Sequence, residues 1–200
     1  MRDAYSAVSG QYIGMFDGGR QDHEDDTALV RRHLTGLPGP VLDLGCGPGH
    51  WTAYLHSSGA EVTGVDMVPE FIAHARATHP GPEFQLDLMT ELDLPEHSVA
   101  GILSWYSTIH LPPPELDRAL VAFRRLLRSS GVLVVGFFDS DDDVARFDHK
   151  VVTAYRWPAD IFSAHLAQAG FVEVQRLQRQ IPERPDRRYA AIAARAAGPG

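Results

Sequence analysis

The chain has 200 residues, of which 44% are apolar and 22% are charged, which predicts a globular domain and excludes a disordered or collagen-like chain. Its 18 Lys and Arg against 26 Asp and Glu give a net charge of −8, which repels phosphate backbones and anionic lipid, so nucleic acid is not an expected partner. The longest apolar runs are far shorter than the roughly 20 residues of a membrane-spanning helix, so no membrane partner is expected either. The single Cys46 cannot form an internal disulfide, and the first residues lack the pattern of a leader peptide, so we expect a cytoplasmic protein.

The first forty residues predict a helical lead-in with a polar break at Gly18-Gly19, followed by a second helix that ends near Leu34. The acidic run from Asp22 to Asp26 stands at the start of that helix, where negative charge complements the helix dipole. Glycine and proline at positions 36 to 40 then end the helix. We therefore predict one domain over residues 1–200, with residues 1–38 as a helical lid and residues 39–200 as the core.

From residue 41 the chain alternates between short apolar segments and longer amphipathic ones. Helices are predicted at 51–58, 69–78, 112–127 and 158–169, and strands at 41–44, 61–66, 83–86, 99–105, 132–138, 171–180 and 189–195. The unbroken apolar run at 132–138 is typical of a strand that is buried on both faces. This alternation predicts an α/β fold with a doubly wound, mostly parallel seven-stranded sheet and helices on both faces.

A glycine-rich loop follows the first predicted strand, with Asp43 ahead of Gly45, Gly47 and Gly49. Glycines at this point let the backbone pass close to a ligand at the carboxyl edge of the sheet. A phosphate-binding loop requires Lys-Ser or Lys-Thr after its last glycine, and a dinucleotide fingerprint requires a third glycine where this chain has His50. Neither phosphate motif fits the loop.

The glycine loop instead resembles the first motif of the class I S-adenosylmethionine-dependent methyltransferases, and further matches follow in order along the chain. Residues 62–66 resemble the second strand of that family, whose terminal acid, here Asp66, accepts hydrogen bonds from both ribose hydroxyls. Residues 126–133 resemble the turn into the fifth strand. The resemblance covers roughly residues 41–135. It implies S-adenosylmethionine as cofactor, S-adenosylhomocysteine as product, and in-line methyl transfer to an O or N atom of a small molecule.

The resemblance also implies which residues form the cofactor site. In similar proteins the lead-in helix folds over the cofactor, where Tyr5 and Tyr12 either bond the methionine carboxylate or only pack that helix onto the domain. The position that usually bonds adenine falls on Leu88, so either the loop bulges to present Asp87 or the backbone of Leu88 and Met89 reads adenine. The full implied set is Tyr5, Tyr12, Asp43, Gly45, Cys46, Gly47, Gly49, Asp66, Met67, Asp87, Leu88, Met89, Ser104 and Trp105.

The segment from Ser104 to His110 follows the fourth predicted strand and resembles a group of small bacterial methyltransferases in which Trp-Tyr-Ser and Ile-His occur together. His110 is the candidate general base, because imidazole titrates near neutral pH. The alternative is that His110 caps the helix opened by Pro112 or bonds a backbone carbonyl. We expect Tyr106, His110, Tyr155 and Trp157 to bind the acceptor, although the last two are also typical of a small satellite core.

No metal is expected, because metal-dependent relatives take an acid from just after the fourth strand, where this chain has Trp105 and Tyr106. The acidic run from Asp139 to Asp143 is therefore interpreted as a solvated loop. Three other functions remain open. These are a cyclase-like step that uses S-adenosylmethionine without methylating, a cofactor-binding regulator, and a nicotinamide oxidoreductase, which titration of both cofactors would eliminate. The sequence carries no prediction of oligomeric state.

Overall fold

The computed structural model describes residues 1–17, 23–149, 151–181 and 184–198, so the predicted break at Gly18-Gly19 lies outside the described residues. The helices in these ranges are α1 (Arg2–Asp17), α2 (Glu24–Leu34), α3 (His50–Ser57), α4 (Pro69–Thr78), α5 (Pro113–Leu126) and α6 (Ala159–Gln168), with a single 3-10 turn, η1 (Thr108–His110). The strands are β1 (Val41–Leu44), β2 (Val62–Asp66), β3 (Glu83–Leu86), β4 (Val99–Trp105), β5 (Leu127–Asp139), β6 (Ala145–Asp148), β7 (Thr153–Trp157), β8 (Phe171–Ile181) and β9 (Arg184–Ala196). None of the described helices is long and apolar enough to cross a membrane.

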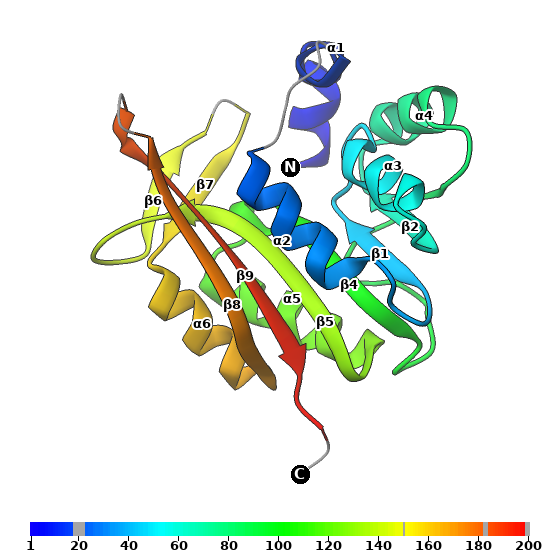
Figure 1. Cartoon of the computed structure of the whole chain (residues 1–200). Helices are drawn as coiled ribbons and strands as arrows, with labels where there is room; N and C mark the ends of the chain where they lie inside the picture. The colour runs from blue at the N-terminus through cyan, green and yellow to red at the C-terminus, as the bar shows by residue number, and fades with distance from the viewer. Residues whose placement is uncertain (18–22, 150, 182–183, 199–200) are drawn as a thin grey trace.

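The strands form one sheet in which β3, β2, β1, β4 and β5 lie side by side and run parallel (Figure 1). On the far side of β5 the antiparallel strand β9 pairs along residues 132–138, and β8 pairs with β9. All seven predicted strands are therefore present. The order reverses between β1 and β4, and doubly wound sheets bind ligands beside such a reversal, at the carboxyl ends of their strands.

Helices cover both faces of this sheet, as the sequence predicted. Along β5 the buried side chains alternate: Val132 and Val134 pack in one apolar cluster with residues of α2 and α3, whereas Leu133 and Val135 pack in another with residues of α5 and α6. Since both faces of β5 are buried, the strand is apolar throughout this stretch. The core thus holds the parallel strands rigidly and fixes the positions of the loops at their ends.

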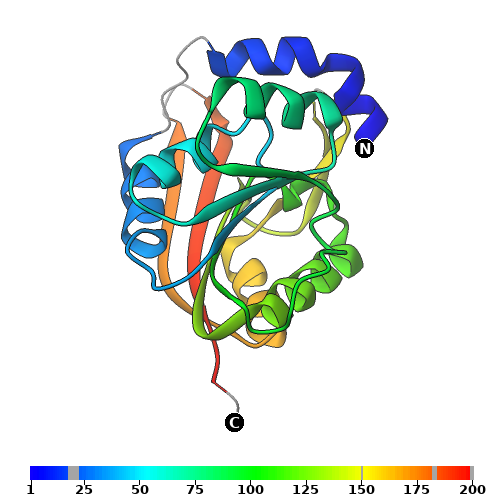
Figure 2. The same cartoon turned by 90° about the vertical axis from the view of Figure 1, so that its right-hand side faces the viewer.

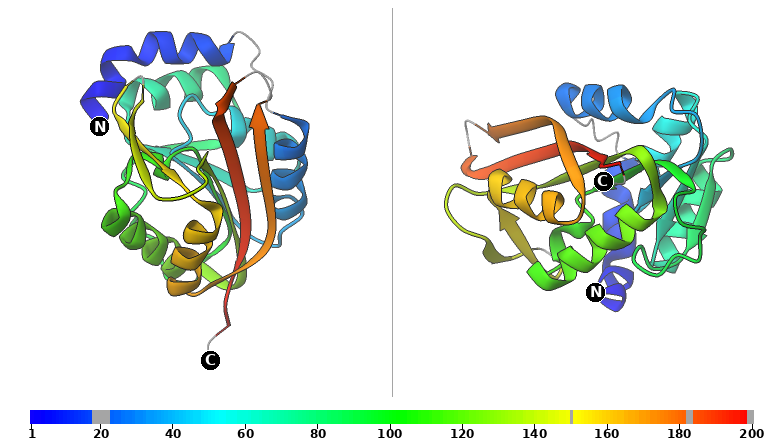
Figure 3. Two further views of the ribbon diagram at one scale, coloured as in Figure 1. Left: turned by 90° about the vertical axis from the view of Figure 1, so that its left-hand side faces the viewer. Right: turned by 90° about the horizontal axis from the view of Figure 1, so that it is seen from below.

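The predicted seven-stranded sheet is wrong in number, because the segment between β5 and α6 adds two strands. Strands β6 and β7 form an antiparallel hairpin, and β7 continues the sheet by pairing in parallel with the last two residues of β5. The hairpin was missed because its strands have only four and five residues and carry charged side chains, which leaves too short a run for its periodicity to identify a strand. It rises from the sheet toward α1 (Figure 3, left).

The two N-terminal helices lie in different places. Helix α1 crosses the carboxyl end of the sheet beside α4 (Figure 2), where Ser6 donates a hydrogen bond of 2.8 Å to Glu70. Helix α2 instead packs on the sheet, with Leu29, Val30 and Leu34 fully buried. The prediction that residues 1–38 form a lid is therefore wrong for α2, since a helix with this buried stripe belongs to the core. That α1 acts as a lid stays a prediction.

Candidate functional site

A pocket opens at the carboxyl ends of the first four parallel strands, beneath α1. Its empty volume is about 580 Å³, part of which is open to solvent. The strand-end loops supply backbone and acids, and α1 supplies rings that cover them. The described lining residues are Met1, Tyr5, Tyr12, Gly45, Gly47, Val65, Asp66, Met67, Val68, Phe71, Asp87, Met89, Trp105, Tyr106, Ser107 and His110.

The glycine loop places bare backbone against this pocket. Gly45 and Gly47 have φ angles of +79° and +54°, a conformation that side-chain-bearing residues rarely adopt. A Cβ atom at Gly45 would collide with the side chain of Ser107. The amides of Gly45 and Cys46 both donate to the carbonyl of Val65, at 2.7 and 3.0 Å, and this pair of bonds fixes the loop to β2.

Asp66 ends β2 and lines the pocket next to the glycine loop. Its carboxylate accepts hydrogen bonds of 2.9 Å from the backbone amides of Gly47 and Val68. Burial raises the pKa of Asp66 above its usual value, and the bonds from these amides oppose that rise. A carboxylate has about four lone-pair sites, so Asp66 keeps acceptor capacity for a ligand hydroxyl beyond its bonds to backbone amides.

The loop after β3 brings two of its three predicted adenine contacts to the pocket. Asp87 and Met89 line it, whereas Leu88 does not and is 39% exposed. Asp87 accepts bonds from the Gln85 amide group at 3.0 Å and from the Leu88 backbone amide at 2.8 Å. Asp87 and Met89 thus both lie at the pocket, and the choice between the two sequence-based alternatives for adenine stays a prediction.

Four other predicted cofactor residues lie outside the lining and support it from behind. Asp43 is 1% exposed and accepts a hydrogen bond of 2.6 Å from Thr52, and its burial raises its pKa to about 7. Cys46 packs among apolar side chains, which raises the pKa of its thiol. Gly49 begins α3 with a φ of +93°. Ser104 is fully buried and is bonded to Ser107 at 2.8 Å.

The loop after β4 supplies the opposite wall. The ring of Trp105 lies against Gly136, where an added Cβ would come within 3.0 Å of the indole. Tyr106 has a φ of +52°, and such strain in a non-glycine residue is typical of functional sites. Ser107 donates a bond of 2.6 Å to the carbonyl of Leu44, so this loop is fixed to the end of β1.

His110 joins three separate parts of the chain at the pocket. Its Nδ1 lies 2.8 Å from the backbone carbonyl of Thr153 on β7, so Nδ1 carries the proton and donates it. Its Nε2 lies 2.7 Å from the hydroxyl of Tyr5 on α1, which donates to this nitrogen. Burial lowers the pKa of His110 and raises that of Tyr5, so both groups are neutral near pH 7. His110 therefore does bond a backbone carbonyl, as the alternative to the general base predicted, but it also has a second hydrogen bond, at Nε2, which that alternative did not include.

The two predicted acceptor residues of the β7 segment are not part of this pocket. Trp157 is 1% exposed and packs against Phe162 and His165, with ring centroids 5.7 and 5.1 Å away. The prediction that Trp157 binds the acceptor is therefore wrong, because a residue of the sheet core is not accessible to a ligand. Tyr155 lies outside the lining and packs, half-buried, against the same core.

The structure adds lining residues that the sequence analysis missed, namely Met1, Val65, Val68, Phe71 and Ser107. The two valines flank the predicted acid Asp66 and Met67, and Ser107 stands inside the Trp-Tyr-Ser run, so proximity to those motifs was the available signal. Phe71 contacts Tyr5 and Tyr12 of α1, with ring centroids at 6.1 and 5.1 Å. No local pattern indicates such contacts, because they join α4 to a helix far away in the sequence.

Comparisons with known proteins match the part of the chain that contains the glycine loop and Asp66. Residues 41–131 match a family model described as a methyltransferase domain. Trans-aconitate 2-methyltransferase of Escherichia coli is 40% identical over 107 residues, which cover 50% of this chain and 39% of the relative. The chain therefore spans less than half the length of that curated relative.

Two solved structures extend the likeness over nearly the whole chain. One is 1,6-didemethyltoxoflavin-N1-methyltransferase of Burkholderia thailandensis with bound 1,6-didemethyltoxoflavin and S-adenosylhomocysteine; it is 26% identical, with a TM-score of 0.76 and coverage of 99% of this chain and 91% of that one. The other is the [4+2]-cyclase SpnF, 16% identical, with a TM-score of 0.81 and coverage of 99% and 96%. The second likeness shows the fold alone.

Proposed function

The chain belongs to the class I S-adenosylmethionine-dependent methyltransferases, and from that premise we propose that it transfers a methyl group from S-adenosylmethionine to an O or N atom of a small molecule. The observation that carries the proposal is the pairing of a bare glycine loop with Asp66 across the carboxyl ends of β1 and β2. Trans-aconitate and 1,6-didemethyltoxoflavin, which appear in the names of the relatives, are both small molecules. Their size supports a small acceptor here.

The pocket residues fit S-adenosylmethionine on chemical grounds. Asp66 offers acceptor atoms for two ribose hydroxyls, and charge-assisted bonds of this kind are among the stronger polar contacts. Gly45 and Gly47 leave room for the ligand to approach the backbone. The lining contains no Lys or Arg side chain among the described residues, which suits a cofactor without phosphate groups. Asp87 and Met89 are the candidate adenine neighbours.

When bound, S-adenosylmethionine supplies a methyl group whose bond to the sulfonium breaks as an acceptor lone pair attacks the methyl carbon, which leaves the neutral thioether S-adenosylhomocysteine. This displacement needs no covalent bond to the protein, so positioning and exclusion of water provide much of the rate. Trp105, Tyr106 and the rings of α1 would exclude water on the acceptor side. The strained backbone at Tyr106 holds that ring in one place.

His110 takes the acceptor's proton in this proposal. Because Nδ1–H donates to Thr153, the lone pair of the imidazole is on Nε2, the atom that a base requires. The depressed pKa of His110 keeps that lone pair available near neutral pH. The acceptor's hydroxyl or ammonium group takes the place of the Tyr5 hydroxyl at Nε2. A hydroxyl gives its proton to this nitrogen as its oxygen attacks the methyl carbon, whereas an ammonium group gives up its proton to Nε2 before the freed lone pair attacks.

The proposal is tested by measuring thermal unfolding with each cofactor added separately. S-adenosylmethionine and S-adenosylhomocysteine should raise the midpoint, because a ligand that binds only the folded state stabilises it by mass action. NAD and NADP should not raise it. A shift with the nicotinamide cofactors alone would assign the pocket to an oxidoreductase. Mass spectrometry of candidate acceptors then separates methyl transfer, which adds a methyl group, from a cyclase-like reaction, which conserves mass, and from a regulator, which leaves every acceptor unchanged.

A further inference from the structure

A set of aromatic rings leads away from the pocket on the side of α1 and the β6–β7 hairpin. Tyr106 and His110 line the pocket, and each contacts a further ring, with centroids 5.2 Å away at Phe138 and 5.4 Å away at His149. Phe138 is the centre of the set, because it also contacts Phe147, Tyr189 and His149, at 5.4, 5.9 and 5.9 Å. We define Tyr106, Phe138, Phe147, His149 and Tyr189 as the ring cluster.

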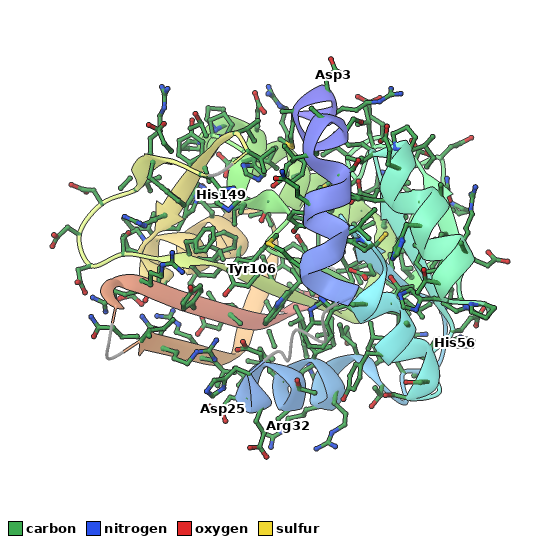
Figure 4. All side chains as sticks on the ribbon, turned by 90° about the horizontal axis from the view of Figure 1, so that it is seen from above. Asp3, Asp25, Arg32, His56, Tyr106 and His149 are labelled. Carbon is green, nitrogen blue, oxygen red and sulfur yellow. The ribbon has the colours of Figure 1, made fainter. Side chains whose placement is uncertain are left out.

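The ring cluster is assembled from four separate segments at the same edge of the sheet. Tyr106 follows β4, Phe138 is the next-to-last residue of β5, Phe147 lies on β6 with His149 directly after that strand, and Tyr189 lies on β9. All five side chains are half-buried, in contrast to the fully buried aromatic rings of the core such as Phe123 and Phe137. Figure 4 shows Tyr106 and His149 in the space between α1 and the hairpin. The rings therefore lie beside the cofactor pocket and keep surface that a ligand can cover.

The described charges around the ring cluster and the pocket are of both signs. The described pocket lining carries Asp66 and Asp87 and no arginine or lysine side chain. Among the described residues, the guanidinium groups of Arg156 and Arg179 lie at the cluster. Arg156 stacks on Phe147 at 4.4 Å, and Arg179, 5.7 Å from Tyr189, donates two hydrogen bonds to the carboxylate of Asp26. Arg156 keeps its charge in this contact, and the amino terminus at Met1 lines the pocket and acts electrostatically on His110, so the rings and not the charges indicate the kind of acceptor.

Resting on the proposed function, we infer that the ring cluster is the acceptor site and that the acceptor is a flat aromatic or heteroaromatic molecule bearing a hydroxyl group or ring nitrogen. Half-buried rings set at edge-on and tilted angles contact a further ring favourably, in addition to the gain from removing apolar surface from water. His110 contacts His149 and also lines the pocket, so it stands where such an acceptor would reach the cofactor.

The experiment measures binding of 6-hydroxyquinoline by calorimetry and saturation-transfer NMR, with the full chain held at saturating S-adenosylhomocysteine. Decahydroquinolin-6-ol is the saturated control of the same framework, and citrate is the aliphatic polyacid control. We expect the quinoline to bind about tenfold more tightly than its saturated analogue, and citrate not to bind. Phe138→Leu should weaken quinoline binding about five- to tenfold while S-adenosylhomocysteine affinity stays within twofold.

Two further variants keep the test decisive. Tyr189→Leu removes a second ring of the cluster and replaces Phe138→Leu if that variant does not fold. Tyr54→Leu makes the same kind of change on α3, outside the pocket lining, and should leave quinoline affinity unchanged. If S-adenosylhomocysteine still binds, any one of four results would overturn the inference. These are equal binding of the saturated analogue, preferential binding of citrate, no binding of any probe, and unchanged quinoline affinity in the cluster variants. Failure of S-adenosylhomocysteine itself to bind would instead overturn the proposed function.

Discussion

The two walls of the pocket are built in different ways. The wall at the ends of β1, β2 and β3 consists of backbone and short acids, with Gly45, Gly47 and Asp66 fixed to one another by bonds to main-chain groups. The opposite wall is made of side chains from distant segments. There Tyr5 and His110, 105 residues apart, are joined by a hydrogen bond, and His110 and Thr153, 43 residues apart, by another.

Because the two walls are built differently, they suit different roles. A wall of backbone and glycines has a single shape, which suits a ligand that is always the same. A wall of rings from several loops can change by substitution without disturbing the sheet, which suits an acceptor that differs among relatives. We therefore expect changes in the first wall to alter cofactor affinity or stability, and changes in the second wall to alter the rate.

The largest expected effect is that of His110→Ala on the methylation rate. Loss of a general base should lower the rate roughly 10²–10⁴-fold, while S-adenosylhomocysteine affinity stays within a few fold, because the base acts on the transition state. Burial lowers the pKa of His110 from 6.5, so the wild-type rate should fall at acidic pH with a midpoint below that value, and the variant should lose this fall. Steady-state rates across pH and calorimetry provide both readouts. A variant that keeps its rate but loses stability would show that His110 is structural.

Asp43→Asn tests the support behind the glycine loop through the pH dependence of stability. Burial raises the pKa of folded Asp43 from 3.8 to about 7, whereas the unfolded chain releases this proton near pH 4. The folded state therefore holds the extra proton between these values, and wild-type stability should fall relative to the variant as pH rises from 4 to 7. The difference should reach up to about 4 kcal/mol and then level off. Urea unfolding of both proteins at several pH values measures it, and parallel curves would show that Asp43 is ionised when folded.

Gly45→Ala should cost about 3 kcal/mol of stability and remove measurable S-adenosylhomocysteine binding. The added methyl group meets Ser107 and forces a side chain into a positive φ, two costs that add. Gly59→Ala is the matched control, because Gly59 has a similar φ of +88° with nothing within 4 Å of the added Cβ. It should cost only about 1 kcal/mol. Equal unfolding free energies for the two variants would mean that Ser107 moves aside to make room for the added methyl group.

Much of the first wall could be predicted from the sequence, because its determinants are local. Gly45, Gly47 and Asp66 are adjacent to the strands that position them, so short motifs indicated both their place and their chemistry. Asp43 and Ser104 were assigned to the cofactor by the same motifs and proved to support the loops from behind. A motif records that a residue type is needed at a position, and whether its side chain faces the ligand or the core depends on packing.

The second wall could not be predicted to the same degree, because it depends on contacts between distant segments. Trp157 and Tyr106 are both aromatic residues at the end of a strand, yet the first is enclosed by α6 and the second faces the pocket. The hydrogen bond between Tyr5 and His110 has no local signal at either residue. The β6–β7 hairpin, which positions His110 through Thr153, has strands of only four and five residues, too short for their pattern to identify them.

Asp66→Asn should weaken S-adenosylhomocysteine binding by about 2 kcal/mol, roughly thirtyfold, because an amide replaces a charged acceptor of ribose hydroxyl bonds. Asp87→Asn is the comparison within the same wall. Since Asp87 already accepts bonds from Gln85 and Leu88, its substitution should weaken binding less. Calorimetric titration of both variants measures the two losses. Equal losses would mean that Asp87 bonds the cofactor as strongly as Asp66 does.

The smallest expected effect is that of Tyr5→Phe, which tests how α1 is joined to the rest of the second wall. Tyr5 donates one neutral hydrogen bond to His110, and such a bond contributes about 1 kcal/mol, so S-adenosylhomocysteine affinity should fall only a few fold as α1 is held less firmly. The methylation rate should also change by no more than a few fold, because the acceptor takes the place of the Tyr5 hydroxyl at Nε2. The pKa of His110, followed by NMR titration, should stay below 6.5, because burial, which this substitution leaves in place, is the main cause of its lowering. A rate as low as that of His110→Ala would instead show that the acceptor's proton passes through the Tyr5 hydroxyl, which would make α1 a part of the reaction and not only a cover.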